Sequence, residues 1–322
     1  MLRRPSTSAL RSNRSDDGSP EGLRYELPEP LASALARSRD RLGVFASDVL
    51  FFPTVESTND VAASVASGSA NPLGGRSGEA EGLVVIADQQ TAGRGRRGHT
   101  WFSPPGSGLY VSVVLMPARS SDPRRATMLL TIAAGVALAE AIEAQTGLSV
   151  DLKWPNDLYI RNKKVGGILA EARADRRRSA RGSLEPLRGA NAPSDSGGSG
   201  VPADVILGYG VNVREIAYPP EISDRSTSLE SELGRAVDRY ELLAETLASL
   251  STRFEDLLAG RFDVILDDWR RRAPAGRGAR VAWMTADGPQ SGVTAGIDDD
   301  GALLVHVGER VERIVGGEVT WL

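Results

Sequence analysis

Residues 93–98 place three arginines between glycines, in the order Gly-Arg-Gly-Arg-Arg-Gly. The segment before them, Leu83–Asp88, is apolar for most of its length and is typical of a buried strand. Glycine lets the backbone approach a ligand closely, and guanidinium groups present paired donors that match carboxylate and phosphate oxygens. We therefore predict a strand that ends in an anion-binding loop.

The same six residues match the dinucleotide-binding pattern G-x-G-x-x-G. That fingerprint requires a helix to begin inside the motif, so that its N-terminus meets the pyrophosphate. Here residues 99–106 follow, with the sequence His-Thr-Trp-Phe-Ser-Pro-Pro-Gly, which cannot be helical. A Rossmann domain is therefore disfavoured. Taken alone, the loop could also be a solvated basic turn or a nucleic-acid contact.

Composition narrows the choice of function. The chain has 322 residues and a net charge of −4, which argues against general binding to nucleic acid or to a membrane surface. It has no cysteine and only two histidines, which excludes a thiol nucleophile, a cysteine zinc site and a histidine metal cluster. No apolar run looks like a membrane span and residues 1–24 lack a secretory signal, so we expect a soluble, cytoplasmic protein.

The N-terminal part predicts a flexible segment over residues 1–44, with one short helix at Leu31–Leu42. A strand near Phe51 and Phe52 then leads to a helix capped by Ser57 or Thr58, with Asp60 completing a capping box. Further along, Leu109–Leu115 alternates like a returning strand. Asp122 and Pro123 start a long helix that ends at Gly147.

The middle of the chain carries a second motif. In the predicted strand 149–154, the apolar side chains face one side and Lys153 faces the other. A turn at Pro155-Asn156-Asp157 leads into a hairpin formed by residues 158–160 and 165–172. Residues 173–203 are rich in Arg, Ser, Gly and Pro without an apolar period, and they predict a disordered insertion.

A third motif lies on the next predicted strand, 204–213, where Gly208, Gly210 and Asn212 share a face that a ligand could approach. A long helix from Asp238 to Gly260 and a shorter one through Trp269 follow. Short strands with Asp-Gly and Gly-Gly turns then predict a separate small β-domain over residues 274–322.

Together, the arginine loop, Lys153 and the glycine-lined face describe a cationic pocket beside an open sheet. Such a pocket suits a reaction between two anions, because holding a carboxylate about 4 Å from a phosphate costs roughly 4 kcal/mol at an effective dielectric near 20. Arginine and lysine would offset that repulsion and stabilise a departing pyrophosphate. The chain has no Walker A motif, so any phosphate-binding site must be formed by a fold other than that of the P-loop proteins.

These motifs closely resemble those of the biotin protein ligases, in order and in spacing. The resemblance covers residues from about 51 to 322 and rests on five segments: 93–104, 153–157 (Lys-Trp-Pro-Asn-Asp), 208–213 (Gly-Tyr-Gly-Val-Asn-Val), and the tail segments 301–304 and 316–318. It implies an α+β fold, with a mixed-sheet catalytic domain over 45–272, related to class II aminoacyl-tRNA synthetases, and an SH3-like barrel over 274–322.

The resemblance also implies the activity of a carbon–nitrogen ligase. Biotin and ATP with Mg²⁺ would give biotinyl-5′-adenylate and pyrophosphate, and a lysine of a biotin carboxyl carrier domain would then take up the biotin. That domain would belong to an acyl-CoA or pyruvate carboxylase, such as acetyl-CoA carboxylase. No protein metal site and no nucleic-acid partner are implied, and we expect a monomer or weak homodimer.

By the same resemblance, the residues expected to contact biotin are Ser57, Thr58, Asn59, Gln90, Arg94, Gly95, Arg96 and Lys153. Those expected to contact ATP or the adenylate are Arg94, Arg96, Arg97, Trp101, Lys153, Asn156 and Asn212. Lys153, Arg94 and Arg96 would carry the catalysis by balancing the charge of the reacting groups.

Two features depart from the family pattern. The first fifty residues cannot supply the winged helix-turn-helix of the bifunctional members, so we expect no operator binding. Between Arg214 and Glu230 only Tyr218 is aromatic, where some members stack adenine on a tryptophan. Two alternatives stay open: a lipoate protein ligase, and a non-enzymatic sensor that binds biotin or DNA.

Overall fold

The computed structural model describes residues 26–69, 80–173, 184–186, 202, 204–286 and 288–322. Its larger sheet is mixed, with strand order β1-β2-β3-β8-β6-β5-β4 and the short β7 paired to β6. Strands β1 and β2 are parallel, and the other neighbours are antiparallel. The bounds are β1 Val49–Val55, β2 Val84–Gln90, β3 Gly108–Leu115, β4 Asp151–Lys153, β5 Asp157–Ile160, β6 Lys163–Arg173, β7 Leu184–Pro186 and β8 Val205–Asn212.

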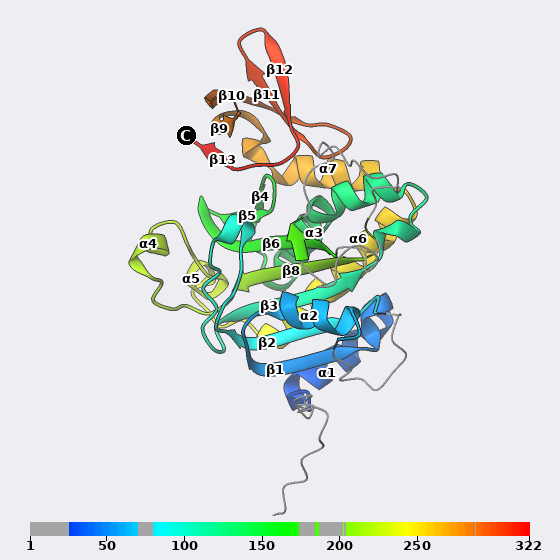
Figure 1. The fold of residues 1–322 in the computed structure, drawn as a ribbon. Helices are drawn as coiled ribbons and strands as arrows, with labels where there is room; N and C mark the ends of the chain where they lie inside the picture. Colours follow the sequence, from blue (N-terminus) through cyan, green and yellow to red (C-terminus); the bar gives the residue numbers. More distant parts are fainter. Residues whose placement is uncertain (1–25, 70–79, 174–183, 187–201, 203, 287) are drawn as a thin grey trace, which may run out of the picture.

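Helices cover both faces of this sheet (Figure 1). Helix α2 (Thr58–Ala66) packs on one face, where Ala62 belongs to the same buried cluster as Val85 of β2 and Leu83, which directly precedes that strand. Helices α3 (Pro123–Thr146), α6 (Arg239–Leu258) and α7 (Phe262–Arg272) cover the other face, against Val84 and Ile86. Since successive side chains of a strand point to opposite faces, β2 is apolar on both, and it is buried as the sequence predicted.

The two long helices begin and end where the sequence predicted. Asp122 accepts a hydrogen bond from the Arg125 amide, and Gly147 ends α3 with a φ of 75°. Asp238 accepts from the amides of residues 240 and 241 at the start of α6. By length and composition alone, helix α3 could cross a membrane, although no apolar run of that kind was predicted from the sequence. However, 72% of its apolar 18-residue stretch is buried inside the protein, as in the core helix of a globular domain.

Gly135 lies in the buried middle of α3, where a methyl group would fit. An added Cβ would lie 3.6 Å from Leu152 Cδ2 and 3.8 Å from Ile168 Cδ1, which are ordinary contact distances. Because alanine has the higher helix propensity, we expect Gly135→Ala to raise the free energy of unfolding by about 0.5–1 kcal/mol. Thermal unfolding would show a higher Tm, and a lower one would contradict this packing.

The N-terminal helix corrects one prediction. Helix α1 (Glu29–Ser38) is followed by two 3₁₀ turns at Arg39–Arg41 and Gly43–Ala46, and its apolar face packs on α6. Leu31 and Phe45 are completely buried. Residues 26–44 are therefore part of the folded domain, whereas the sequence predicted a flexible segment over 1–44. Residues 1–25 lie outside the described residues.

Most of the predicted insertion, 173–203, also lies outside the described residues, apart from β7, which pairs with the end of β6. The hairpin before it formed as expected, because Arg161 and Asn162 both adopt positive φ in the turn between β5 and β6.

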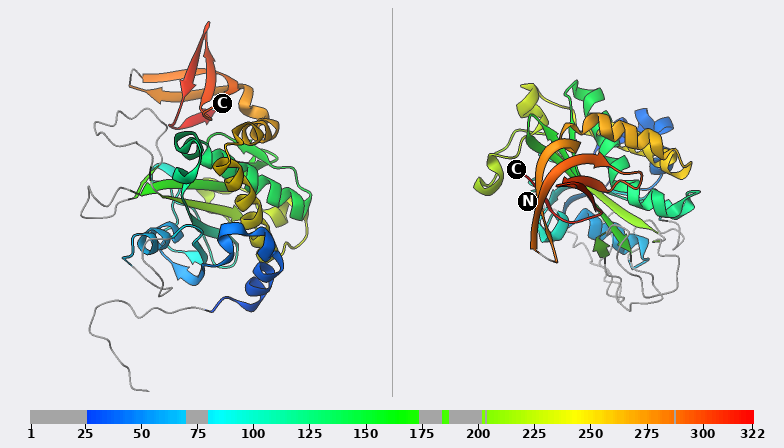
Figure 2. Two further views of the ribbon diagram at one scale, coloured as in Figure 1. Left: turned by 90° about the vertical axis from the view of Figure 1, so that its right-hand side faces the viewer. Right: turned by 90° about the horizontal axis from the view of Figure 1, so that it is seen from above.

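The second domain is a five-stranded antiparallel sheet preceded by the 3₁₀ turn Pro274–Gly276. Its order is β12-β11-β10-β9-β13, with bounds β9 Arg277–Thr285, β10 Gly288–Ile297, β11 Leu303–Val307, β12 Arg310–Ile314 and β13 Val319–Trp321. Figures 1 and 2 show this domain stacked beyond the β4 edge of the first sheet, next to α7. The Trp154 indole N–H donates to the Gly301 carbonyl at 3.0 Å, and Arg125 donates to the Asp299 carbonyl at 2.9 Å.

Candidate functional site

A cavity of about 690 Å³ opens where the carboxyl end of β2, the hairpin β5–β6, strand β8 and the second domain meet. Every residue that the sequence predicted for the site lines this cavity, although these residues come from segments far apart in the chain. The set is Ser57, Thr58, Asn59, Gln90, Arg94, Gly95, Arg96, Arg97, Trp101, Lys153, Asn156 and Asn212. A roughly 700 Å³ cavity is of the size that holds a small organic ligand or nucleotide.

One end of the cavity is polar and uncharged. Ser57 is the N-cap of α2, but its hydroxyl does not cap the helix. Instead, Gln90 Oε1 accepts from the Thr58 amide at 2.9 Å and lies 3.2 Å from its hydroxyl. The expected capping box with Asp60 is therefore wrong, because a side chain from β2 takes that place. The Ser57 hydroxyl, on a residue only 3% exposed, is left to face the cavity.

A buried polar chain continues from this end. Ser112 Oγ lies 2.7 Å from Thr58 Oγ1 and 2.5 Å from Asn59 Oδ1, and Asn59 Nδ2 donates to Glu171 Oε2 at 2.7 Å. Glu171 is 7% exposed and also accepts from Arg94 Nη2 at 3.0 Å. Neither Ser112 nor Glu171 was predicted from the sequence. A single acid in the apolar run of β6 was the available signal for Glu171.

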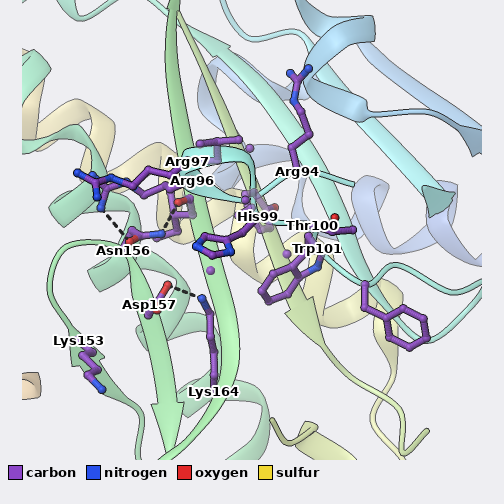
Figure 3. Close-up of a pocket in the computed structure, with 18 of the residues that line it drawn as sticks. Arg94, Arg96, Arg97, His99, Thr100, Trp101, Lys153, Asn156, Asp157 and Lys164 are labelled. Carbon is purple, nitrogen blue, oxygen red and sulfur yellow. Dashed lines mark hydrogen bonds and ion pairs between the residues drawn. The ribbon is translucent and has the colours of Figure 1, made fainter. Parts of the chain in front are cut away.

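The arginine loop does not direct all its guanidinium groups to one point. Arg94 pairs with Asp60 and Glu171, and Figure 3 shows it pointing away from Arg96 and Arg97. Arg96 Nη1 donates to Asn156 Oδ1 at 3.3 Å. Burial lowers the pKa of Arg96, and the charge of Arg97 adds to this effect. Arg97 is about half exposed and lies 3.8 Å from Glu318 Oε2, so a bound anion would chiefly favour the charged form of the more buried Arg96.

The glycine-lined face of β8 is closely approached, as the sequence predicted, but by side chains of the protein. A Cβ on Gly208 would lie 2.2 Å from Asn59 Oδ1, and one on Gly210 would lie 2.4 Å from Trp101 Nε1. The Trp101 indole N–H is buried and has no acceptor within the described part of the chain. The ammonium of Lys164 lies 5.5 Å from the centroid of that ring.

Lys153 lies on β4 with its side chain on the cavity side, while Trp154 faces the core, as the alternation predicted. Burial lowers the pKa of Lys153; the negative charge of Asp157 opposes the shift and the positive charge of Lys164 adds to it. Figure 3 shows its ammonium directed away from the loop arginines. It lies 4.8 Å from the Tyr159 ring centroid and 5.2 Å from that of Trp321, and neither partner was predicted from the sequence.

Asn212 has a structural partner as well as a place on the cavity wall. Its Nδ2 donates to the Thr227 carbonyl at 3.0 Å, and the Tyr218 hydroxyl donates to the same carbonyl at 3.1 Å. Both residues line the cavity, so the loop after β8 closes one of its sides. In the described residues, no group of three or more His, Cys, Asp or Glu side chains could hold a metal ion.

Comparison with known proteins identifies the family. Residues 74–184 match the model of the biotin/lipoate A/B protein ligase family. The biotin--[acetyl-CoA-carboxylase] ligase of Mycobacterium tuberculosis is 30% identical over 250 residues, which cover 75% of this chain and 80% of that protein. The bifunctional ligase/repressor BirA of Bacillus spizizenii is 35% identical over 243 residues; the match covers 74% of this chain but only 66% of that relative's length.

The fold agrees with these matches. The biotin protein ligase of Aquifex aeolicus, solved in complex with biotin and ATP, superposes with a TM-score of 0.64 at 26% sequence identity. The alignment covers 86% of this chain and 99% of the Aquifex chain. The chain belongs to the biotin protein ligase family.

Proposed function

We propose that the protein is an ATP-dependent biotin protein ligase. A carboxylate oxygen of biotin attacks the α-phosphorus of ATP, and the bond to pyrophosphate breaks, which gives biotinyl-5′-adenylate. The amine of a carrier lysine then attacks the acyl carbon, forms an amide, and releases AMP and a proton. The carrier is the biotin carboxyl carrier domain of a carboxylase, and the reaction takes place in the cytoplasm.

The observation that carries this proposal is the difference in polarity between the two ends of this cavity. Its buried, uncharged end, formed by Ser57, Thr58 and Gln90, suits the neutral ureido ring of biotin. Arg96, Arg97 and Lys153 line the rest, where a carboxylate and phosphates would meet. Binding one ligand at the first end would therefore place its carboxylate among cations.

Arg94 has a more conditional role in this proposal. Its guanidinium is compensated by Asp60 and Glu171, so it must exchange at least one of these partners before it can bind the carboxylate of biotin. Arg96 and Arg97 have fewer such partners and would bind the phosphates, with Asn156 orienting Arg96. Trp101 would offer its ring and its free N–H to the adenylate.

Mg²⁺ is proposed to arrive with the nucleotide. The carboxylates on the cavity wall already have cationic partners, since Asp157 pairs with Lys164 and Glu318 with Arg97. The described residues thus provide no acidic cage, and magnesium commonly binds through substrate phosphates with few protein ligands.

The test is to incubate the protein with ATP, Mg²⁺, a carrier domain, and either biotin or lipoate, and then to weigh the carrier by mass spectrometry. We expect a biotin-sized increment on one carrier lysine. A lipoate-sized increment would indicate a lipoate ligase instead. Binding of biotin without any modified carrier would favour a sensor.

The lowered pKa of Lys153 predicts a pH dependence. Its ammonium form is lost as the pH rises through a pKa that lies below the ordinary 10.5, so kcat/KM for adenylation should fall on the alkaline side before an ordinary lysine titrates. A guanidinium keeps its charge over this range. The residual activity of Lys153→Arg should therefore lack this fall, and identical alkaline limbs in both proteins would assign the titration to another group.

A further inference from the structure

Trp321 reaches the cavity from the second domain. It lies on β13, which is paired with β9, so the second sheet fixes its backbone. Its ring and that of Tyr159, from β5 of the first sheet, both lie within about 5 Å of the Lys153 ammonium, at 5.2 and 4.8 Å between Nζ and the ring centroids. Two domains thus contribute one aromatic ring each to the surroundings of the same lysine.

This arrangement differs from that of the other lysine beside the cavity. Lys164 Nζ lies 2.7 Å from Asp157 Oδ1, so its charge is compensated within the protein. No carboxylate of the described residues forms an ion pair with Lys153. An aromatic ring attracts a cation through its quadrupole without neutralising it. Lys153 is therefore restrained while its full charge stays available to an incoming anion.

The second domain also holds the opposite face of β4. Trp154 is 4% exposed and donates its indole N–H to the Gly301 carbonyl. Gly301 has a φ of 80°, and a Cβ there would lie 2.9 Å from Leu129 Cδ2, so the β10–β11 turn sits tightly on α3. Lys153 and Trp154 point to opposite sides of the strand, and the same domain contacts both.

We propose, on the basis of the ligase function above, that Trp321 is a positioning residue for Lys153. The ring restrains the lysine stem at the end of the cavity formed by β4 and β13, which limits the orientations that its ammonium samples. Trp321 does not bind biotin in this scheme. Its effect on adenylation passes through Lys153, so the rate of the chemical step should depend on the presence of an aromatic ring.

The test compares Trp321→Leu with Trp321→Phe in the full-length protein, using biotin-dependent exchange of pyrophosphate into ATP. For Trp321→Leu, we expect kcat to fall about 3- to 10-fold, the range of a partly desolvated cation–π contact, with a smaller change in KM for biotin. Trp321→Phe should recover most of the lost rate, because it keeps a ring.

Leu322→Ala is the matched control, since this neighbour is 70% exposed and does not line the cavity. If Trp321→Leu does not fold, Tyr159→Leu removes the other ring, with Tyr159→Phe as its rescue. Wild-type kcat in the leucine variants, or phenylalanine variants as slow as the leucine ones, would overturn the positioning role. A wild-type protein without exchange activity would overturn the ligase function itself, before any variant is compared.

Discussion

Lys153→Ala is expected to lower the rate of biotinyl-adenylate formation by about 100- to 1000-fold, the usual cost of losing one group that stabilises developing charge. Lys153 is the lysine on the cavity wall whose ammonium has no carboxylate partner in the described residues, so its charge is free for a substrate anion. The fold should survive, because β4 is held by Leu152 and Trp154 on its other face. Pyrophosphate exchange would measure the rate, and thermal unfolding would verify the fold.

Lys163→Ala provides the matched control. Lys163 is exposed at the start of β6 and is absent from the cavity wall, so its loss should leave adenylation unchanged. Lys153→Ala with normal adenylation would remove the residue from the site. A variant that loses transfer to the carrier but still accumulates adenylate would place Lys153 in the second step.

The residues that the sequence predicted for the site all line one cavity, because the motifs that mark them are local. The arginine loop, the lysine strand and the glycine strand each have a recognisable pattern, and their order matched a known family. The motifs did not reveal, however, which way each side chain points. Arg94 is drawn away from Arg96 by Asp60 and Glu171, and no pattern in residues 93–98 encodes a pairing with an acid more than seventy residues further along.

The same contrast between local features and long-range contacts holds for the fold. The caps of α3 and α6 were predictable, because a cap depends on a few neighbouring residues. The cap of α2 could not be predicted in this way, because Gln90 supplies it from β2 and not from the residues around the helix start. The segment containing helix α1 was predicted to be flexible for a related reason. A ten-residue helix has little stability by itself, and α1 is stabilised by packing on α6. The contact between Trp321 and Lys153 likewise depends on how two domains meet.

Gly208→Ala is expected to weaken biotin binding strongly. The new Cβ would lie 2.2 Å from Asn59 Oδ1 and 3.0 Å from its Cγ, so the Asn59 side chain would have to move. That side chain is 4% exposed and holds Glu171 and Ser112 by hydrogen bonds. Moving it leaves buried polar groups without partners, at about 1–3 kcal/mol for each.

Two measurements follow from this displacement. KM for biotin should rise at least about 10-fold, since 1.4 kcal/mol corresponds to a factor of ten in affinity. Thermal unfolding should also shift to lower temperature. Gly135→Ala adds the same methyl to a buried glycine of α3 without a clash, so it should bind biotin normally and unfold no earlier than the wild type.

The buried chain from Gln90 to Glu171 gives this prediction a second consequence. Glu171 Oε2 accepts from both Asn59 and Arg94, so displacing Asn59 leaves Arg94 as the partner of an otherwise unsatisfied carboxylate. Arg94 would then be less available to a substrate carboxylate, and the loss in Gly208→Ala should exceed that in Ser57→Ala, which removes one hydroxyl at the cavity wall. An equal or smaller loss in Gly208→Ala would show that the two ends of the cavity act independently.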